Sequence, residues 1–467
     1  MSRRQSLPPN PQRASPQAET TPARRAPAPQ PEAGRICIIG AGSSGVAVAK
    51  ALIERGVPFD CFEKGSDLGG MWRYENDNGL SSAYRSLHID TSRGNLGYSD
   101  FPIPEDSPDF LAHDALLAHL EAYADRFGVR ERVTFRAEVA RVEPEGGDAA
   151  GARWRVTLAS GESRRYAAVV VANGHLWDPR LPTFPGRIDG PVIHSHHYRT
   201  AAPFEDRDVL VVGIGNSAVD IAVDLCRRAR SVTLSTRRSA WIMPKYLMGI
   251  PVDRWSAFLS RRLRLPTRLV RLIMSRLIRL GVGDQARFGL PHPAHPMWRE
   301  HATLSQDLLS CVGHGRILIK PNLRELRGDR ALFEDGTSAP CDAVIYATGY
   351  RTTFPFLAPE VFAVEDNRTV ALYRRIAAPE RPGLYFIGLV QPVGPTIPLV
   401  EIQAKWLADV LSGGLRLPPP AAMAAEIDAH QRALARTYVG SPRYTLEVDF
   451  KQYAGELQRA LRSGKLA

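Results

Sequence analysis

A glycine-rich loop between an apolar strand and a helix constrains this chain more than any other feature. Residues 35–39, RICII, form an apolar run that predicts a buried strand. The run breaks at GAGSSG, residues 40–45, and residues 46–55 then follow helical spacing up to Gly56. A G-x-G-x-x-G in this context lets the backbone approach a pyrophosphate at the helix N-terminus. We therefore expect a dinucleotide to contact Gly40, Ala41, Gly42, Ser43, Ser44 and Gly45.

An acidic residue follows at the point where a ribose needs one. Residues 59–63 predict a second strand, which ends at Glu63. In a dinucleotide-binding unit, an acid at this place accepts hydrogen bonds from the ribose hydroxyls. Strand, glycine loop, helix, strand and acid therefore occur in the order that such a unit requires, and this order predicts an α/β fold.

The same pattern occurs a second time with a different ending. Residues 209–212 predict a strand, and GIGNSA follows at residues 213–218. A helix is expected to run to Arg230, and residues 232–235 predict the next strand. This strand is followed by two arginines instead of an acid. They are either a solvated pair or a site for a 2′-phosphate, which a guanidinium binds and an acid would repel. The first unit thus suits FAD and the second NADPH, with second-site contacts at Gly213, Gly215, Asn216, Ser217, Ala218, Arg237 and Arg238.

Two further segments fit a flavoprotein that passes hydride from NADPH to FAD. Residues 341–350, CDAVIYATGY, predict a buried strand that ends in ATGY. Residues 383–406 predict a strand, a loop rich in glycine and proline, and a helix that could reach the isoalloxazine end of FAD. The candidate cofactor-binding residues in these segments are Thr348, Gly349 and Gln391.

Together these motifs resemble the flavin-containing monooxygenases of class B. The resemblance runs from about Arg35 to about Tyr453, which is most of the chain. It is carried by GAGSSG, by FEK followed by LGGMW, and by YSDFP, GIGNSA, STRR, ATGY and GLVQP.

A longer family motif, F-x-G-x-x-x-H-x-x-x-(Y/F), is present with one change. It reads IDGPVIHSHHY here, with Gly190, His194 and Tyr198 in place. Ile188 stands where the family has Phe. His194 belongs either to the function of this motif or to the packed interior as a structural histidine.

The resemblance implies that the segment after FEK wraps the flavin. Gly70 would allow close backbone approach, and Met71 and Trp72 would lie against the cofactor. SLHIDTSR would lie near the reactive face, where the family usually has Asn and this chain has Asp90, followed by Thr91. Asp90 is therefore the catalytic candidate. Either burial keeps Asp90 protonated, so that it donates a hydrogen bond as Asn does, or it is ionised and more peroxide leaks.

The resemblance also implies the reaction. NADPH reduces FAD, the reduced flavin captures O2 as a C4a-hydroperoxide, and a soft nucleophile takes up one oxygen atom. The substrate would be a small molecule with an amine nitrogen or a sulfide sulfur. Because the cofactor supplies the difficult chemistry, we expect neither an acid–base triad nor a metal site.

Three other functions remain open at this point. A Baeyer–Villiger monooxygenase, which oxygenates ketones, shares both glycine loops, but its motif ends in Trp-Pro where this chain has Tyr198 and Arg199. An NADPH oxidase that releases only peroxide would suit the carboxylate of Asp90. A non-catalytic NADP-binding scaffold would have less reason to keep both loops, Glu63 and Arg237.

The predicted organisation has two Rossmann-like dinucleotide-binding domains. A discontinuous FAD domain is expected at 35–203 and 328–453, around an NADPH domain at 204–327 that carries a basic helical insertion at 240–300. Residues 1–34, rich in Pro, Ala, Gln and Arg, are expected to be a disordered tail. Residues 454–467 are expected to be a C-terminal tail.

The net charge of +11 is concentrated in two segments. Residues 1–35 and residues 255–280 account for all of it, and the second segment has seven arginines and no acid. Since positive and negative charges balance in the rest of the chain, we expect no nucleic-acid partner. Leu, Ile and Arg alternate at helical spacing in 255–280, which suits either a cover over the substrate cavity, which we favour, or contact with an anionic membrane surface. No apolar run reaches transmembrane length.

The five cysteines show no pairing pattern. Cys37, Cys61, Cys226, Cys311 and Cys341 include no C-x-x-C, which argues against a disulfide framework and against a dithiol oxidoreductase. We expect packed thiols in a reducing compartment, and hence a cytoplasmic protein. The sequence leaves the oligomeric state open.

Overall fold

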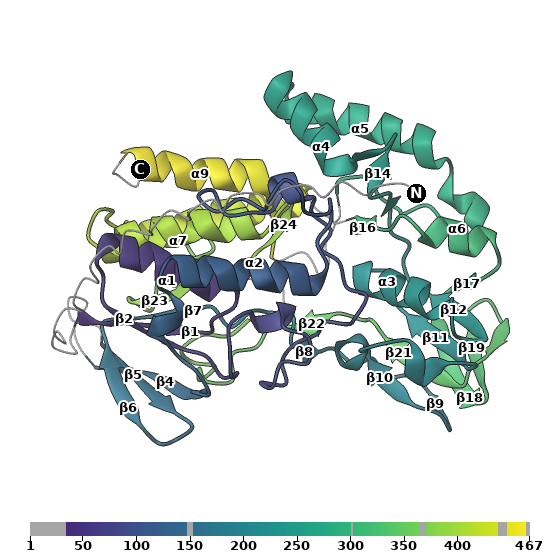
Figure 1. Ribbon diagram of the computed structural model, residues 1–467, viewed down its shortest axis with the longest axis horizontal. Helices are drawn as coiled ribbons and strands as arrows, with labels where there is room; N and C mark the ends of the chain where they lie inside the picture. The colour runs from purple at the N-terminus through teal and green to yellow at the C-terminus, as the bar shows by residue number, and fades with distance from the viewer. Residues whose placement is uncertain (1–33, 147–152, 300–301, 365–369, 438–445, 464–467) are drawn as a thin grey trace, which may run out of the picture.

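Two parallel β-sheets organise the chain into two lobes. The structure is a computed structural model that describes residues 34–146, 153–299, 302–364, 370–437 and 446–463. We call the part built on the sheet β23-β7-β1-β2-β3 the first lobe, and the part built on the sheet β10-β21-β11-β12-β17 the second lobe. Figure 1 shows the lobes side by side. The α/β fold with two Rossmann-type domains is confirmed. The expected tail at 1–34 lies almost entirely outside the described residues.

The first lobe has three layers. Its sheet consists of β1 (Ile36–Ile39), β2 (Phe59–Phe62), β3 (Val133–Thr134), β7 (Ala168–Val171) and β23 (Leu384–Phe386), all parallel. One face packs against α1 (Ser43–Arg55), α2 (His113–Arg126), α7 (Ile397–Leu411), α8 (Pro420–Thr437) and α9 (Phe450–Ser463). The other face packs against the antiparallel strands β4 (Val139–Glu145), β5 (Arg153–Leu158) and β6 (Ser163–Tyr166). Because both faces are covered, all four residues of β1 are buried, as an unbroken apolar run predicts.

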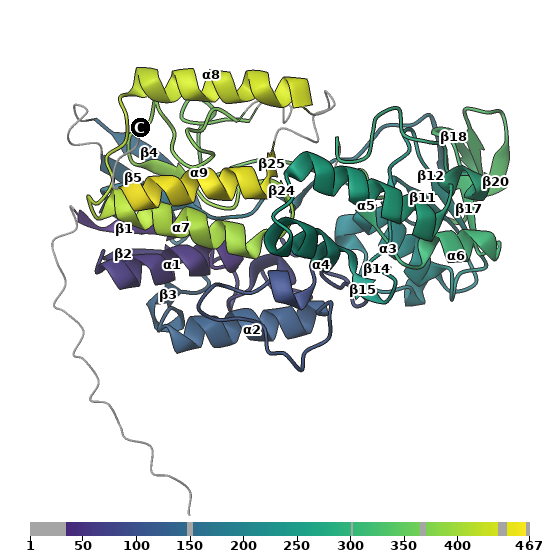
Figure 2. The ribbon, with the colours of Figure 1, turned by 90° about the horizontal axis from the view of Figure 1, so that it is seen from above.

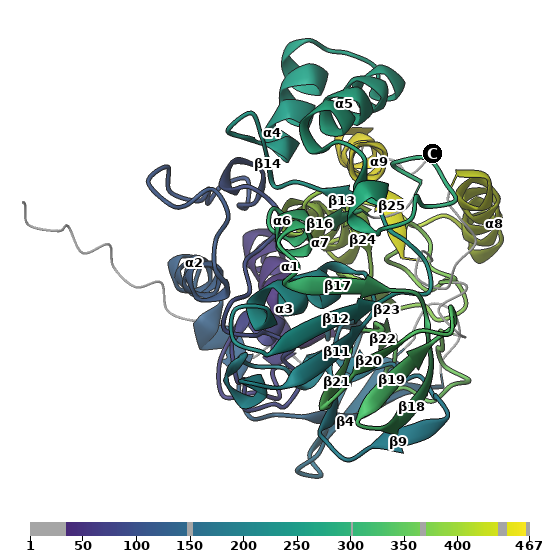
Figure 3. The same cartoon turned by 90° about the vertical axis from the view of Figure 1, so that its right-hand side faces the viewer.

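The second lobe repeats this layering. Its parallel sheet consists of β10 (Val192–His194), β11 (Asp208–Val212), β12 (Ser231–Ser235), β17 (Ile317–Lys320) and β21 (Ala343–Tyr346), most of which Figure 3 shows stacked in order. One face packs against α3 (Asn216–Leu225) and α6 (Leu308–Gly313). The other packs against β9 (Gly186–Ile188), β18 (Leu323–Gly328), β19 (Arg330–Phe333) and β20 (Ser338–Pro340).

The strand pairing does not follow the expected domain boundaries at 203/204 and 327/328. β10 precedes the first boundary and β21 follows the second, yet they pair with each other, and β21 pairs with β11. Gly190 explains how β10 fits, since a Cβ there would lie 1.7 Å from the carbonyl oxygen of Asp342. The chain returns to the first sheet only at β23.

The segment after residue 453 is helical where a tail was expected. α9 continues to Ser463, and Ala454, Leu457 and Ala460 are buried in the core of the first lobe. The apolar residues at helical spacing therefore belong to the packed fold. The last four residues lie outside the described ranges.

The described part of the expected basic insertion, residues 240–299, forms a small helical unit over the junction of the lobes (Figure 2). α5 buries Val270, Met274 and Ile278 in a separate apolar cluster. Ion pairs of 2.8 Å join Arg254 to Asp109 and Arg271 to Asp449, both in the first lobe. The elements of the insertion are β13 (Ile242–Met243), β14 (Tyr246–Leu247), β15 (Ile250–Pro251), α4 (Val252–Ala257), the π-helix η7 (Phe258–Arg262), α5 (Thr267–Val282) and η8 (Gln285–Phe288), and β16 (Thr303–Leu304) follows it.

Short elements connect these layers. They are η2 (Gly70–Trp72), η3 (Arg93–Asn95), η4 (Arg130–Arg132), β8 (Asp178–Pro179), η5 (Ser195–His197), η6 (Ala202–Phe204), β22 (Tyr350–Arg351), β24 (Gln391–Val393) and β25 (Glu447–Asp449). Within the described ranges, no helix combines the length and the apolar composition needed to cross a membrane.

Candidate active site between the lobes

The first glycine loop is built for close backbone contact. Gly40 has a φ of +99°, and a Cβ there would lie 2.8 Å from the carbonyl oxygen of Ala172. A Cβ on Gly45 would lie 1.9 Å from the carbonyl oxygen of Gly40, so the helix can start only if this residue is glycine. Gly42 is the N-cap residue of α1, so no side chain caps the helix, and the first turn has no acidic residue. The N-terminus of α1 is therefore open to an anion.

Glu63 follows β2 and secures this loop. The side chain is 4% exposed. Its Oε2 accepts a hydrogen bond from the Ala41 amide at 2.8 Å, and its Oε1 accepts one from the Gly65 amide at 2.8 Å. A carboxylate has about four lone-pair positions, so acceptor capacity remains for a ribose. A cavity of about 460 Å³ opens beside it, lined by residues that include Lys64, Asn78 and 134–138. These features fit the adenosine part of FAD.

The segment after Glu63, which the resemblance places around the flavin, folds back over the first glycine loop. Gly69 and Gly70 both have positive φ, +111° and +55°, and a Cβ on Gly70 would lie 3.1 Å from the Cα of Gly42. η2 carries Met71 and Trp72, and Trp72 packs partly buried against the core of the first lobe. The backbone of Gly69 and Gly70 thus lies against the first glycine loop, and the Gly69 amide donates to the carbonyl oxygen of Ala41 at 3.1 Å.

The second glycine loop has the same construction. Gly213 has a φ of +139°, and a Cβ there would lie 2.4 Å from the carbonyl oxygen of Ala347. Gly215 caps α3 without a side-chain hydrogen bond, and the first turn again has no acid. Thr348 and Gly349 follow β21, so these predicted residues lie beside the second loop. The N-terminus of α3 could hold a second pyrophosphate.

Arg237 and Arg238 lie just beyond β12 at the same edge of the sheet. Both side chains are exposed. In the part of the chain that the structure describes, neither guanidinium lies within ion-pair distance of a carboxylate. They are therefore available to a phosphate at the end of the second nucleotide site.

Gln391 and the GLVQP loop approach the first glycine loop from another side. A Cβ on Gly388 would lie 2.2 Å from the Oγ of Ser44. Gln391 begins β24, and its backbone N–H donates to the carbonyl oxygen of Leu446 at 2.7 Å. The loop therefore brings residues near 390 to the N-terminal end of α1.

The catalytic candidate Asp90 bridges the two lobes. Its Oδ2 accepts a hydrogen bond of 2.7 Å from the Nδ2 of Asn216, the first residue of α3. Its Oδ1 lies 3.1 Å from the Nζ of Lys245, in the insertion. Thr91 follows Asp90 and is half-buried. The predicted flavin-side loop and the predicted NADPH-side loop thus meet at Asp90.

A second acid lies close to this bridge. The Tyr84 hydroxyl donates to the Oδ2 of Asp220 at 2.9 Å. Burial raises the pKa of Asp90, and the Lys245 ammonium acts in the opposite direction. Burial, together with the charge of Asp90, raises the pKa of Asp220 to about 7. Near neutral pH the junction therefore holds two carboxyl groups, one ammonium and an exchangeable proton.

Sequence reasoning missed Asp220 and Lys245. Asn216, Asp220 and Asp224 recur every four residues along α3, and this polar row could have indicated a buried polar face. Lys245 has no comparable signal, because its approach to Asp90 depends on how the insertion folds over the first lobe.

The family motif around His194 is packed into the interior. His194 is 2% exposed, and its Nδ1 accepts a hydrogen bond from the His196 amide at 3.1 Å. Burial lowers the pKa of His194 to about 4, so the ring is neutral at physiological pH. The Tyr198 hydroxyl donates to Asp224 at 2.6 Å. His194 is therefore a neutral, packed side chain at the end of β10 in the second sheet.

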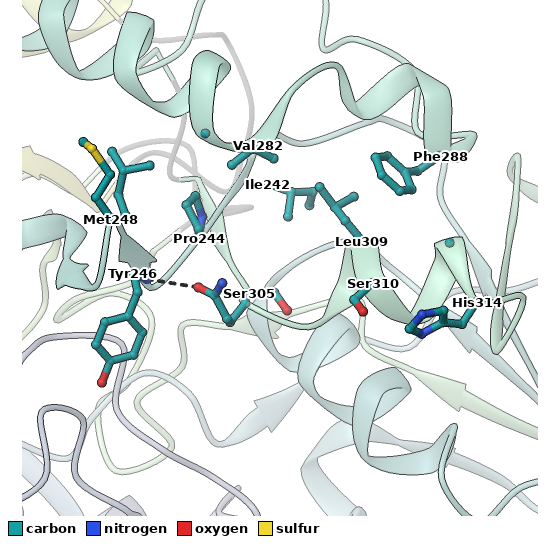
Figure 4. A pocket seen from close by; sticks show the side chains of 14 residues that line it. Ile242, Pro244, Tyr246, Met248, Val282, Phe288, Ser305, Leu309, Ser310 and His314 are labelled. Carbon is teal, nitrogen blue, oxygen red and sulfur yellow. Dashed lines mark hydrogen bonds between the residues drawn. The ribbon is translucent and has the colours of Figure 1, made fainter.

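A larger cavity, of about 630 Å³, lies within the second lobe (Figure 4). It is formed by the insertion and α6, with Ile242, Val282, Phe288 and Leu309 among its lining residues. The Tyr246 amide donates to Gln306 at 3.1 Å at one end. The cavity is not lined by either glycine loop, so its size alone does not make it the reaction site.

Comparisons with known proteins agree with these features. A family model described as flavin-binding monooxygenase-like matches residues 33–464. Flavin-containing monooxygenase 5 of Oryctolagus cuniculus is 36% identical over 444 residues, which is 91% of this chain and 82% of that protein. Dimethylaniline monooxygenase (N-oxide-forming) 2 of Rattus norvegicus is 35% identical, over 91% of this chain and 82% of that protein. The structure of S-allyl-L-cysteine S-oxygenase of Allium sativum has a TM-score of 0.68 and 27% identity, and the match covers 93% of this chain and 89% of that one.

Proposed function

Because the chain belongs to the flavin-binding monooxygenase-like family, we propose that it transfers one oxygen atom from O2 to the amine nitrogen or sulfide sulfur of a small molecule, using FAD and NADPH. The relatives' names point to nitrogen and to sulfur as the oxygenated atoms. The observation that carries the proposal is the meeting of the two glycine-loop units at Asp90 and Asn216, 2.7 Å apart.

The first lobe would hold FAD. The pyrophosphate would lie on Gly40–Gly45 at the N-terminus of α1, and Glu63 would accept from the ribose. Gly70, Met71 and Trp72 would cover the cofactor, and Thr91 and Gln391 would lie toward its isoalloxazine end. The open helix N-terminus and the close approach of Gly70 to Gly42 support this assignment.

The second lobe would hold NADPH. The pyrophosphate would lie on Gly213–Ala218 at the N-terminus of α3, with Thr348 and Gly349 beside it. Arg237 and Arg238 would bind the 2′-phosphate, because no carboxylate of the described residues engages them.

Bound FAD, once reduced by NADPH, would supply the chemistry that activates O2. The chain would place the two nucleotides against each other and keep water away from the activated oxygen. Ion pairs of Arg254 and Arg271 with the first lobe support a covering role for the insertion. The exposed side chains of Leu272, Leu280 and Arg276 on its outer face leave peripheral contact with an anionic membrane as the alternative.

A peroxide-forming NADPH oxidase is the second candidate function. The observation that favours it is the carboxylate at Asp90, which accepts a hydrogen bond from Asn216 and forms an ion pair with Lys245. An acceptor at this place offers no hydrogen to an activated oxygen.

One experiment separates these functions. The flavin-loaded protein is given NADPH, O2 and a panel of amines, sulfides and ketones, and oxygenated product and peroxide are both counted per NADPH. With amines or sulfides, we expect the amount of oxygenated product to be a substantial fraction of the amount of NADPH consumed. Peroxide equal to NADPH with every substrate would establish the oxidase, and ketone-derived esters alone would establish a Baeyer–Villiger enzyme.

We also propose that the protein is cytoplasmic. All five cysteines are free thiols, including Cys226 and Cys311, whose sulfur atoms lie 3.6 Å apart. Thiols this close persist unlinked in a reducing compartment.

A further inference from the structure

Lys245 extends from the insertion to a carboxylate of the other lobe. Its Nζ lies 3.1 Å from the Oδ1 of Asp90 and 5.4 Å from the centre of the Phe110 ring. The side chain is 16% exposed. Asp90 and Phe110 both belong to the first lobe, so the ammonium is held at the interface by a charge and by an aromatic face.

The carboxylate of Asp90 lies directly beside the second glycine loop. Asn216, which donates to Asp90, is the first residue of α3 and follows Gly215. The Leu304 amide donates to the Oδ1 of Asn216 at 3.0 Å, so the amide of Asn216 is fixed between two partners. Asp90 thus places a negative charge close to the helix end on which the proposed function puts a pyrophosphate.

A carboxylate and a pyrophosphate at one helix N-terminus repel each other unless a cation lies between them or beside them. Among the described residues, Lys245 is the cation that forms an ion pair with Asp90. We propose that Lys245 is a positioning residue for the nicotinamide dinucleotide: it neutralises Asp90 and so keeps the N-terminus of α3 available to the pyrophosphate. This inference rests on the proposed function, because it requires NADPH to bind at the second loop.

Loss of the ammonium would leave Asp90 without its counter-charge. In a partly buried site an uncompensated carboxylate is costly, and nearby phosphate charges make it more so. We therefore expect Lys245→Met to weaken nucleotide binding about tenfold or more. The effect must depend on Asp90, since Lys245 acts through that residue.

The test is a double-mutant cycle on NADP+ binding, which needs no turnover. NADP+ is titrated into the FAD-loaded protein by calorimetry. Wild type is compared with Lys245→Met, and Asp90→Asn is compared with Asp90→Asn/Lys245→Met. We expect the loss caused by Lys245→Met to shrink from about tenfold to about twofold or less in the Asp90→Asn background.

A charge-matched control comes from the same lobe. Arg230 forms a 2.8 Å ion pair with Asp208 at the opposite end of the sheet from the glycine loop. Arg230→Met removes one positive charge and should leave NADP+ affinity within about twofold. FAD content and the unfolding temperature without nucleotide show whether each variant is folded.

Three results would overturn the inference. One is a Lys245→Met variant that is folded, holds FAD and binds NADP+ as wild type does. Another is a loss of equal size with and without Asp90→Asn, which would mean that Lys245 contacts the nucleotide directly or acts through the fold. If wild type binds FAD but no NADP+, the proposed function itself fails, and this inference fails with it.

Discussion

At the residue scale, we propose that Arg237 and Arg238 distinguish NADPH from NADH. Both are exposed at the end of β12, and a guanidinium pairs with the 2′-phosphate that NADH lacks. We predict that Arg237→Ala raises the KM for NADPH about ten- to a hundredfold and leaves the KM for NADH nearly unchanged. Steady-state kinetics with both nucleotides measures this. An equal loss for both would remove the 2′-phosphate role.

Asp220 makes a pH-dependent contribution to stability. Its pKa in the folded protein is about 7, well above the ordinary value for Asp, because of burial and the charge of Asp90; Lys245 and the Tyr84 hydroxyl partly oppose this rise. Between the ordinary value and about 7, the folded state holds a proton that the unfolded state has released. The contribution of Asp220 to the free energy of unfolding is therefore lost as the pH rises through that window.

The corresponding variant is Asp220→Asn, which keeps an acceptor for the Tyr84 hydroxyl but cannot ionise. We predict that the unfolding temperature of the variant minus that of wild type increases from about pH 5 to about pH 8, by a few degrees. Thermal unfolding of the FAD-loaded proteins at several pH values measures it. A difference that does not change with pH would show that Asp220 does not titrate in this range.

Sequence reasoning could name candidate site residues only where a local motif marks them. The glycines of both loops, Glu63 and Arg237 follow strands that the apolar pattern indicates. Asp90 came from resemblance to a family motif. Its contacts with Asn216 and Lys245 could not be predicted, because they join segments more than a hundred residues apart in sequence.

At the element scale, apolar runs predicted strands well and helix ends poorly. The strand expected at 209–212 is β11, Asp208–Val212. The helix expected to reach Arg230 ends at Leu225, because the chain turns there and the Arg230 amide donates to the carbonyl oxygen of Arg207. The pairing of β10 with β21 sets the lobe boundaries, and no local pattern in the sequence predicts this pairing.

Gly190 should be essential for that pairing. A Cβ there would lie 1.7 Å from the carbonyl oxygen of Asp342, a backbone atom that cannot move without shifting the strand β21. We predict that Gly190→Ala lowers the yield of folded protein severely, or lowers the unfolding temperature by several degrees. Gly146→Ala, where a Cβ would meet nothing within 4 Å, is the control. Equal behaviour of the two variants would contradict the close approach.

The insertion should act as a cover through Asp253 in α4. Its Oδ2 accepts hydrogen bonds from the Ser92 amide at 2.9 Å and from Asn95 at 3.1 Å, which ties α4 to the loop that follows Asp90. We predict that Asp253→Ala raises the substrate KM and the peroxide released per NADPH, each severalfold, because the loop loses its anchor. Steady-state kinetics with peroxide detection measures both.

The control for this prediction uses the outer surface of the insertion. Arg261 and Arg262 are exposed, so Arg261→Gln/Arg262→Gln should leave the KM unchanged. We also expect wild type not to sediment with anionic vesicles. Salt-sensitive sedimentation that the double variant abolishes would instead make this surface a membrane contact.

At the scale of the whole molecule, each lobe has its own apolar core. Two clusters of buried residues flank the first sheet and two others flank the second. Tyr84 and Leu87 cross from the first lobe into a second-lobe cluster. The other contacts between the lobes described above are polar, such as those of Asp90 and of Arg254 with Asp109, or place the Lys245 ammonium near the Phe110 ring. Since lobes with separate cores unfold as separate cooperative units, the two nucleotides should stabilise different parts of the molecule.

We predict two transitions in calorimetric unfolding of the protein. Removing FAD should lower the midpoint of one, and adding NADP+ in large excess over its dissociation constant should raise the other by an amount that grows with the logarithm of its concentration. The lobes would then communicate mainly through the junction at Asp90, so Asp90→Asn/Lys245→Met should move the two midpoints further apart. If one transition shifts as a whole with either nucleotide, the polar junction couples the lobes more strongly than their separate cores indicate, and the two sites share a single folding unit.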